Sequence, residues 1–176
     1  MTTTRLTRYD RSMLRLMNDR RARPLYATAP RRRLVVGAHL ALSVAIGALV
    51  AYSGLGAGEP VWPFVAVAVL LLPWMVATGA INAATRGLLE LRERALDERQ
   101  SAERSRVRAR AHRATTLLLA AIVVGLLVAG AVGGKALTVY AAPVVVAVLA
   151  VHWLMPLWVA GLTVQDEPAD SDGLTA

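Results

Sequence analysis

The sequence contains no cysteine, and only one of its 20 basic residues is a lysine. The absence of cysteine excludes disulfide bonds, thiolate metal sites and cysteine nucleophiles. The scarcity of lysine accompanies a composition rich in Ala, Val, Gly, Leu and Arg, which GC-rich coding produces. We therefore draw no chemical argument from the preference for arginine over lysine.

Charged residues are also absent from four long apolar runs, at about residues 34–55, 61–84, 115–132 and 137–164. Each run is close to the ~20 residues that a helix needs to cross ~30 Å of hydrocarbon. With 56% hydrophobic residues and a mean hydropathy of +0.47, the chain is too apolar for an ordinary soluble domain. The sequence predicts an all-α fold, a four-helix transmembrane bundle.

The four runs divide the chain into three parts. Residues 34–164 form one membrane domain, preceded by a basic arm at 1–33 and followed by an acidic tail at 165–176. The tail has four acidic residues and no basic one, which is typical of a disordered segment.

The lack of charge inside the runs argues against one large class of membrane proteins. Ion-coupled and proton-coupled transporters need a buried ionisable group to hold the coupling ion. A small four-helix proton-coupled exporter would carry a carboxylate in its first span, and residues 34–55 contain none.

The arginines are distributed very unevenly between the connectors. Ten lie in residues 1–33 and nine in residues 86–113, whereas the connectors at 54–60 and 133–136 contain only Glu59 and Lys135. Because short positively charged connectors stay in the cytoplasm, the sequence predicts a multi-pass protein of a bacterial plasma (inner) membrane with both termini inside.

An alternative interpretation of the first span is a cleavable export signal. Arg31 to Arg33 precede the run as in a twin-arginine signal, and Ala51 to Ser53 is a possible cleavage site. We favour an uncleaved span, because the run exceeds the 7–15 residues usual for a signal core and three more runs follow.

The basic arm contains a short amphipathic pattern. Residues 5–18 place apolar side chains at spacings of three and four, with arginines mostly on the other side. This predicts a helix on the inner leaflet with its arginines among anionic headgroups. A disordered basic tail is the alternative, and nucleic-acid binding is disfavoured because no nucleic-acid-binding fold motif accompanies the arginines.

The connector 86–113 contains no proline and one glycine, so we expect it to be a cytoplasmic helical hairpin. It extends the second span, turns near 97–101 and runs back into the third. It is the best candidate surface for a protein partner, and a solvated linker is the alternative. The candidate lipid or partner contacts of the arm and the connector are Arg5, Arg8, Arg11, Arg15, Arg104, Arg106, Arg108 and Arg110.

Two runs carry small residues at regular spacing, which lets helix backbones approach closely in lipid. We expect these rows to pack helices within the chain, with self-association as the alternative. The helix-packing candidates are Gly37, Ala41, Ala45, Ala121, Gly125, Ala129 and Gly133.

A few polar residues lie in the halves of the runs that border the arginine-rich connectors. We expect them to be hydrogen-bonded packing residues, and a shared polar cavity is the alternative. They are too few for a metal site, and the chain lacks catalytic and phosphate-binding motifs, so we expect no cofactor and no enzymatic activity. The cavity candidates are His39, Ser43, Thr78, Asn82 and His152.

The stretch 95–100 (ALDERQ), followed by 108–113 (RARAHR), resembles a pattern in small actinobacterial membrane proteins. Those are uncharacterised families of three or four spans, in which an LDER stretch precedes a basic, alanine-containing run into the next helix. The resemblance covers residues 95–113 and implies the architecture and a GC-rich bacterial origin, but no activity.

Together these patterns favour a non-enzymatic membrane scaffold or accessory subunit that binds anionic lipid and a protein partner through its basic face. The first alternative is a channel or carrier for a weakly polar solute, lined by the cavity candidates. The second is a membrane-tethered nucleic-acid-binding factor.

Overall fold

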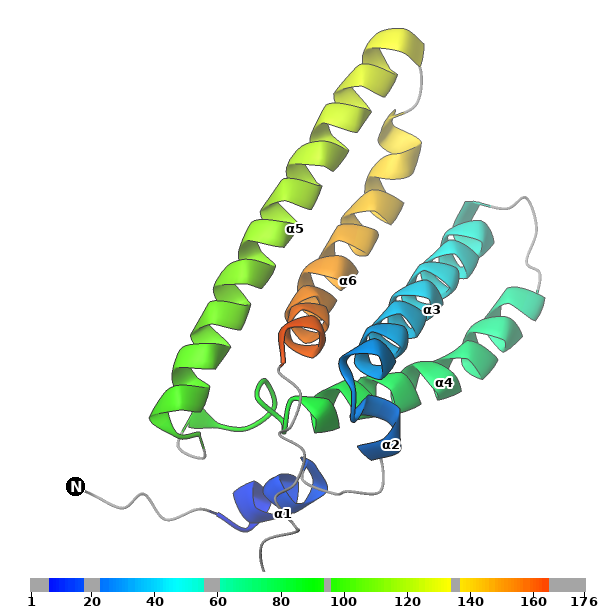
Figure 1. Cartoon of the computed structure of the whole chain (residues 1–176). Coiled ribbons are helices and arrows are strands. Elements are labelled where there is room, and N and C mark those ends of the chain that lie inside the picture. Colours follow the sequence, from blue (N-terminus) through cyan, green and yellow to red (C-terminus); the bar gives the residue numbers. More distant parts are fainter. Residues whose placement is uncertain (1–6, 18–22, 56–60, 94–95, 134–136, 165–176) are drawn as a thin grey trace, which may run out of the picture.

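The computed structural model describes residues 7–17, 23–55, 61–93, 96–133 and 137–164, and within these ranges all regular structure is helical (Figure 1). The prediction of an all-α fold is confirmed. The helices are α1 (Arg8–Met17), α2 (Arg23–Tyr26), α3 (Ala29–Leu55), α4 (Trp62–Ala84), α5 (Glu98–Gly133) and α6 (Leu137–Thr163).

Four helices, α3, α4, α5 and α6, are long and apolar enough to cross a membrane. Their positions match the four apolar runs of the sequence, so the chain is a multi-pass membrane protein. The helix α5 is 36 residues long, about 54 Å at 1.5 Å per residue, which exceeds the ~30 Å of the hydrocarbon layer. Its arginine-bearing first half therefore extends beyond the apolar run.

The four long helices form two antiparallel hairpins, α3–α4 and α5–α6 (Figure 1). The helix α6 joins them, because it packs on α5 and also contacts α3 and α4. We call the end that holds the start of α3, the end of α4, the start of α5 and the end of α6 the Arg-rich end. Figure 1 shows the short helices α1 and α2 at this end.

The helix α4 ends in a Schellman motif rather than continuing into the connector. Arg86 and Gly87 have positive φ angles of 51° and 69°, and the Gly87 N–H donates to the carbonyl oxygen of Asn82 over 2.8 Å. Residues 85–90 form consecutive turns. The expectation that helix continues from residue 86 is therefore wrong for the first half of the connector, because two consecutive left-handed residues end the helix.

The second half of the connector is helical, as expected. The helix α5 begins with a capping box, in which the Gln100 N–H donates to Asp97 Oδ1 over 2.6 Å and the Asp97 N–H donates to Gln100 Oε1 over 3.1 Å. The reversal predicted near residues 97–101 thus coincides with the start of α5.

The buried residues gather at the Arg-rich end. One cluster joins Val36, Ile81, Leu154, Leu157 and Trp158 of three helices. A second cluster joins Leu88 of the turns, Val107 of α5 and Ala160 of α6. Apart from Pro63, none of the described residues at 40–76, 116–128 and 144–153 is buried.

Gly161 lies at a close contact between the hairpins. A Cβ atom added there would lie 2.8 Å from Val36 Cγ2 and 2.9 Å from Ile81 Cγ2, which is too close for real atoms. Any larger residue at this position would force Val36 or Ile81 to shift, so glycine is favoured where α6 crosses α3 and α4.

Candidate functional site

His39 is the centre of a polar cluster that joins three of the long helices. It lies on α3, its exposed fraction is 0%, and both of its ring nitrogens are hydrogen-bonded. Nε2 lies 2.9 Å from Thr78 Oγ1 of α4, and Nδ1 accepts the indole N–H of Trp158 of α6 over 2.9 Å. The imidazole thus connects α3 to both α4 and α6.

The direction of these hydrogen bonds fixes the protonation state of His39. An indole N–H can only donate, so Nδ1 must be the acceptor and Nε2 carries the proton of a neutral ring. Nε2–H then donates to the hydroxyl of Thr78, whose own proton goes to the carbonyl oxygen of Trp74 over 2.8 Å. An imidazolium would place a second N–H against the indole N–H of Trp158.

Ser43 completes the cluster one turn further along α3. Its hydroxyl accepts the indole N–H of Trp74 over 2.9 Å and donates to the carbonyl oxygen of His39 over 2.8 Å. The His39 ring also lies against both indoles, with centroid distances of 4.8 Å to Trp74 and 6.2 Å to Trp158. Every polar side chain in this cluster has a partner within the protein, so the cluster fastens helices together.

The five predicted cavity residues separate into two groups. His39, Ser43 and Thr78 share the cluster. His152 is exposed on α6 and does not join it, and Asn82 is buried near the end of α4 with its Oδ1 atom unpaired. His152 therefore does not share a site with His39, Ser43 and Thr78, because its position on α6 directs it away from α3 and α4.

A narrow recess lies between the same helices. The recess between α2, α3, α4 and α6, lined in part by Arg32, Val36 and Gly161, is too narrow for a water molecule. Among the described residues there is also no group of three His, Asp or Glu side chains able to hold a metal ion. The channel hypothesis stays a prediction.

The turns after α4 close the Arg-rich end of the bundle. The side chains of Leu88 and Leu91 are 6% and 2% exposed, and the turns that carry them contact α5. Arg104 of α5 holds them there, because its guanidinium donates to the carbonyl oxygens of Leu89 and Leu91 over 2.9 Å and 2.8 Å. Arg104, predicted as an outward contact for lipid or a partner, instead turns inward and secures the connector.

The helix α1 lies across this closed end (Figure 1). Thr7 precedes its first residue, and its N–H and hydroxyl both donate to Asp10 Oδ2 over 2.9 Å and 2.7 Å. Met17 fits against Gly87, where an added Cβ would lie 2.7 Å from Met17 Cγ. The Arg92 guanidinium stands 5.1 Å from the centroid of the Tyr9 ring. The predicted amphipathic helix thus exists and contacts the protein's own turns.

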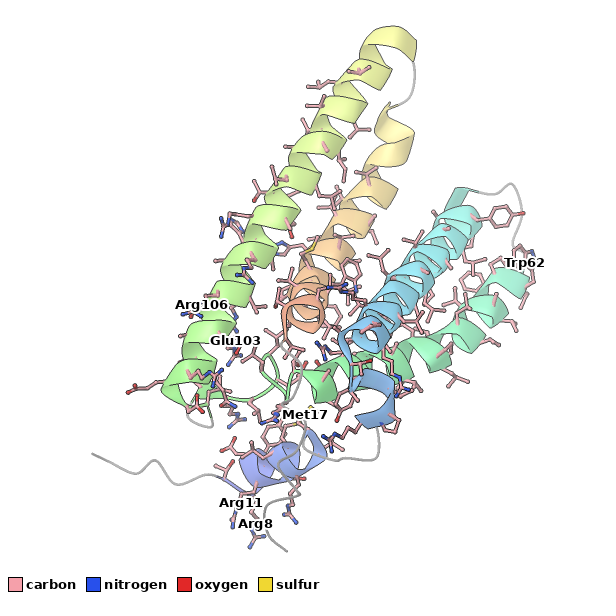
Figure 2. All side chains as sticks on the ribbon, viewed as in Figure 1. Arg8, Arg11, Met17, Trp62, Glu103 and Arg106 are labelled. Carbon is pink, nitrogen blue, oxygen red and sulfur yellow. The ribbon has the colours of Figure 1, made fainter. Side chains whose placement is uncertain are left out.

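The remaining predicted arginines point outward. Figure 2 shows Arg8 and Arg11 directed away from the long helices, and Arg106 directed away from α6. Arg15, Arg108 and Arg110 are exposed as well. Arg5 lies outside the described residues. Among the described residues, the predicted basic contacts are thus exposed at the surface, with Arg104 as the exception.

Most of the described residues in the predicted helix-packing rows do not lie between the helices. Gly37 and Gly125 would each accept a Cβ with no atom within 4 Å, and Ala41 and Ala121 are exposed. Ala45 is half-buried, while the side chains at residues 129 and 133 lie outside those described. The intramolecular role is wrong for Gly37, Ala41, Ala121 and Gly125, because α3 and α5 present other faces to their neighbours.

Sequence reasoning missed three participants of the site: Trp74, Trp158 and Gly161. A tryptophan deep in a span needs an acceptor for its N–H, which is a usable signal. This signal does not separate Trp158 from Trp153, which is 77% exposed. For Gly161 no spacing pattern marks the position.

Comparison with protein-family models, with curated proteins and with solved structures finds no match for this chain. The resemblance to small actinobacterial membrane proteins stays a prediction. The class of protein defined by the fold is a multi-pass membrane protein whose described helices are fastened at one end.

Proposed function

We propose that this protein is a non-enzymatic membrane scaffold or accessory subunit that binds a protein partner and anionic lipid through its Arg-rich end. One observation carries the proposal. The outward arginines lie at the Arg-rich end, where the buried residues of the described chain gather. The polar groups around His39 hydrogen-bond to one another, which supports a structural role for them.

The partner surface lies on one face of α1. Arg8, Arg11 and Arg15 recur at spacings of three and four on α1, so they share one helix face. The other side of α1 rests on the turns, where Arg92 of the connector contacts Tyr9. We call Arg8, Arg11 and Arg15 the α1 platform. Its charge suits an acidic segment of a protein in the adjoining aqueous phase.

The test is a comparison of co-purified proteins. Deleting residues 86–113 would remove the buried Leu88, Leu91 and Val107, so surface charge reversal is the cleaner change. The full chain is purified in mild detergent from its native host as wild type, as R8E/R11E/R15E, and as the matched control R106E/R110E/R113E. We expect the α1 variant to lose a partner that the control retains, as measured by quantitative mass spectrometry. An identical set of proteins in all three preparations would contradict the proposal.

We further propose that the Arg-rich end faces the cytoplasm of the plasma membrane, because positively charged connectors are retained there. The cysteine-free sequence makes this easy to test, since each introduced cysteine is unique. Arg99→Cys lies at the start of α5, and Val61→Cys lies at the far end of α4. With a membrane-impermeant maleimide on intact cells, we expect labelling of Val61→Cys alone. Labelling of Arg99→Cys in intact cells would reverse the orientation.

A further inference from the structure

The outward face of α5 combines charge and apolar surface in an unusual way. Arg106, Arg110 and Arg113 recur at spacings of four and three, so they lie on one face of the helix. All three are exposed. A different face, with Val107 and Ala111 each 2% exposed, packs against the rest of the protein.

The same face continues into the apolar half of α5 without a break. Leu117 follows Arg113 by four residues and Val124 follows by eleven, which keeps both on the arginine face. These two side chains are 72% and 58% exposed, so they lie at the lipid-facing surface of a membrane protein. The stretch 106–113 contains no acidic residue, and Glu103 lies one turn before it (Figure 2).

We propose that this face of α5 binds an anionic phospholipid, with the phosphate at Arg110 and Arg113 and an acyl chain along Leu117 and Val124. The inference rests on the proposed function and names the ligand for its lipid-binding part. An amphiphile with a negative head and an apolar tail matches this surface, because guanidinium groups pair with phosphate and the adjoining side chains are apolar.

The geometry favours a lipid over a soluble anion. Arg113 and Leu117 are about 6 Å apart along the helix axis, so a bound phosphate and its acyl chain would reach both at once. A free phosphate would use the arginines alone. An acidic protein would gain nothing from Leu117 and Val124, which are embedded at the level of the hydrocarbon.

The α1 platform provides the contrast. Its arginines are also exposed, but α1 is a ten-residue helix that does not continue into a span. Figure 2 shows Arg8 and Arg11 directed away from the long helices. This row therefore has the charge without the continuous apolar surface, and we expect it to contribute little to the selection of lipid.

The experiment measures which lipids the purified full-length protein retains. Wild type, R110Q/R113Q and R8Q/R11Q are each equilibrated in mixed micelles with equal parts of phosphatidylcholine and phosphatidylglycerol, then repurified. The ratio of the two retained lipids is measured by mass spectrometry. R110K/R113K serves as a charge-conserving control, and size-exclusion chromatography with circular dichroism verifies that every variant is folded.

We expect wild type, R8Q/R11Q and R110K/R113K to retain an excess of phosphatidylglycerol. R110Q/R113Q should lose most of it, because each basic residue near an anionic surface contributes about a five-fold factor in affinity, and two contribute about twenty-five-fold. Equal retention by R110Q/R113Q and R8Q/R11Q, or no excess in wild type, would overturn the lipid site.

This result is separable from the proposed function. The scaffold proposal depends on the partner that R8E/R11E/R15E loses. A protein that shows no preference for phosphatidylglycerol, yet loses its partner in that variant, would refute the α5 lipid site and leave the scaffold proposal standing. A protein that prefers phosphatidylglycerol but loses no partner in R8E/R11E/R15E would refute the scaffold proposal and leave the α5 lipid site standing.

Discussion

The two ends of the long helices differ in how they are held together. At the Arg-rich end, α6 meets α3 and α4 through His39, Trp158 and Gly161. Arg32 adds a contact there, because its guanidinium donates to the carbonyl oxygen of Val164 over 2.9 Å. Among the described residues nearer the other end, only Pro63 is buried.

This difference shows what drives helix association when lipid is the solvent. Lipid tails are as apolar as leucine, so apolar side chains gain little by leaving them for another helix. Helices therefore meet where polar groups require partners or where a small residue permits close contact. Both conditions are satisfied at the Arg-rich end, so the two hairpins are joined to each other there.

The largest expected effect comes from the turns that close the Arg-rich end. Leu91→Ala removes a side chain that is 2% exposed, and such truncations cost about 2–5 kcal/mol. The matched control is Leu127→Ala, where the side chain is 67% exposed on α5. We expect thermal unfolding in detergent to show a clear loss of stability for Leu91→Ala alone. Equal losses of stability in both variants would contradict the conclusion that the Arg-rich end is the more tightly packed of the two ends.

Much of the fold could be predicted from the sequence, because twenty consecutive apolar residues in water-free surroundings must satisfy their backbone groups as a helix. Which face of each helix packs against the protein, and which faces lipid, could not be predicted. The rows with Gly37 and Gly125 have the spacing of a packing face, yet they point outward. Lipid-facing and protein-facing side chains are equally apolar, so the pattern that marks the inner face of a soluble helix is missing here.

The same limit explains the error at Arg104. It belongs to an arginine-rich stretch, and composition alone predicts a solvated charge. Its spacing to Val107, Ala111 and Thr115 is three, seven and eleven, which places it on the buried face of α5. This signal was present in the sequence. The acceptors of its hydrogen bonds are backbone carbonyls of the turns, which no residue pattern reveals.

An intermediate effect is expected at the contact between the hairpins. Gly161→Ala places a Cβ 2.8 Å from Val36 Cγ2, and overpacking of this kind costs about 1–3 kcal/mol. Gly125→Ala adds the same methyl group where no atom lies within 4 Å. We expect a lower unfolding temperature for Gly161→Ala and no decrease for Gly125→Ala, since alanine favours the helix.

The Gly125 variants also test the alternative that the outward small-residue rows join two copies of the chain. Gly125→Leu leaves the contacts within the chain intact. If two copies pack through this row, cross-linking in native membranes will show fewer dimers in Gly125→Leu than in wild type. An unchanged yield of dimers would exclude this row as the contact.

The smallest expected effect concerns the hydrogen bond between Trp158 and His39. Trp158→Phe removes the indole N–H and leaves an aromatic ring in place, and hydrogen bonds between membrane helices average about 0.6 kcal/mol, with a maximum of about 1.7. Trp153→Phe is the control, because that indole is 77% exposed on the same helix. We expect a small decrease in unfolding temperature for Trp158→Phe alone. A decrease of equal size in both variants would mean that the loss of indole surface, rather than the bond to His39, sets the stability, and the cluster would then not be what joins α6 to α3.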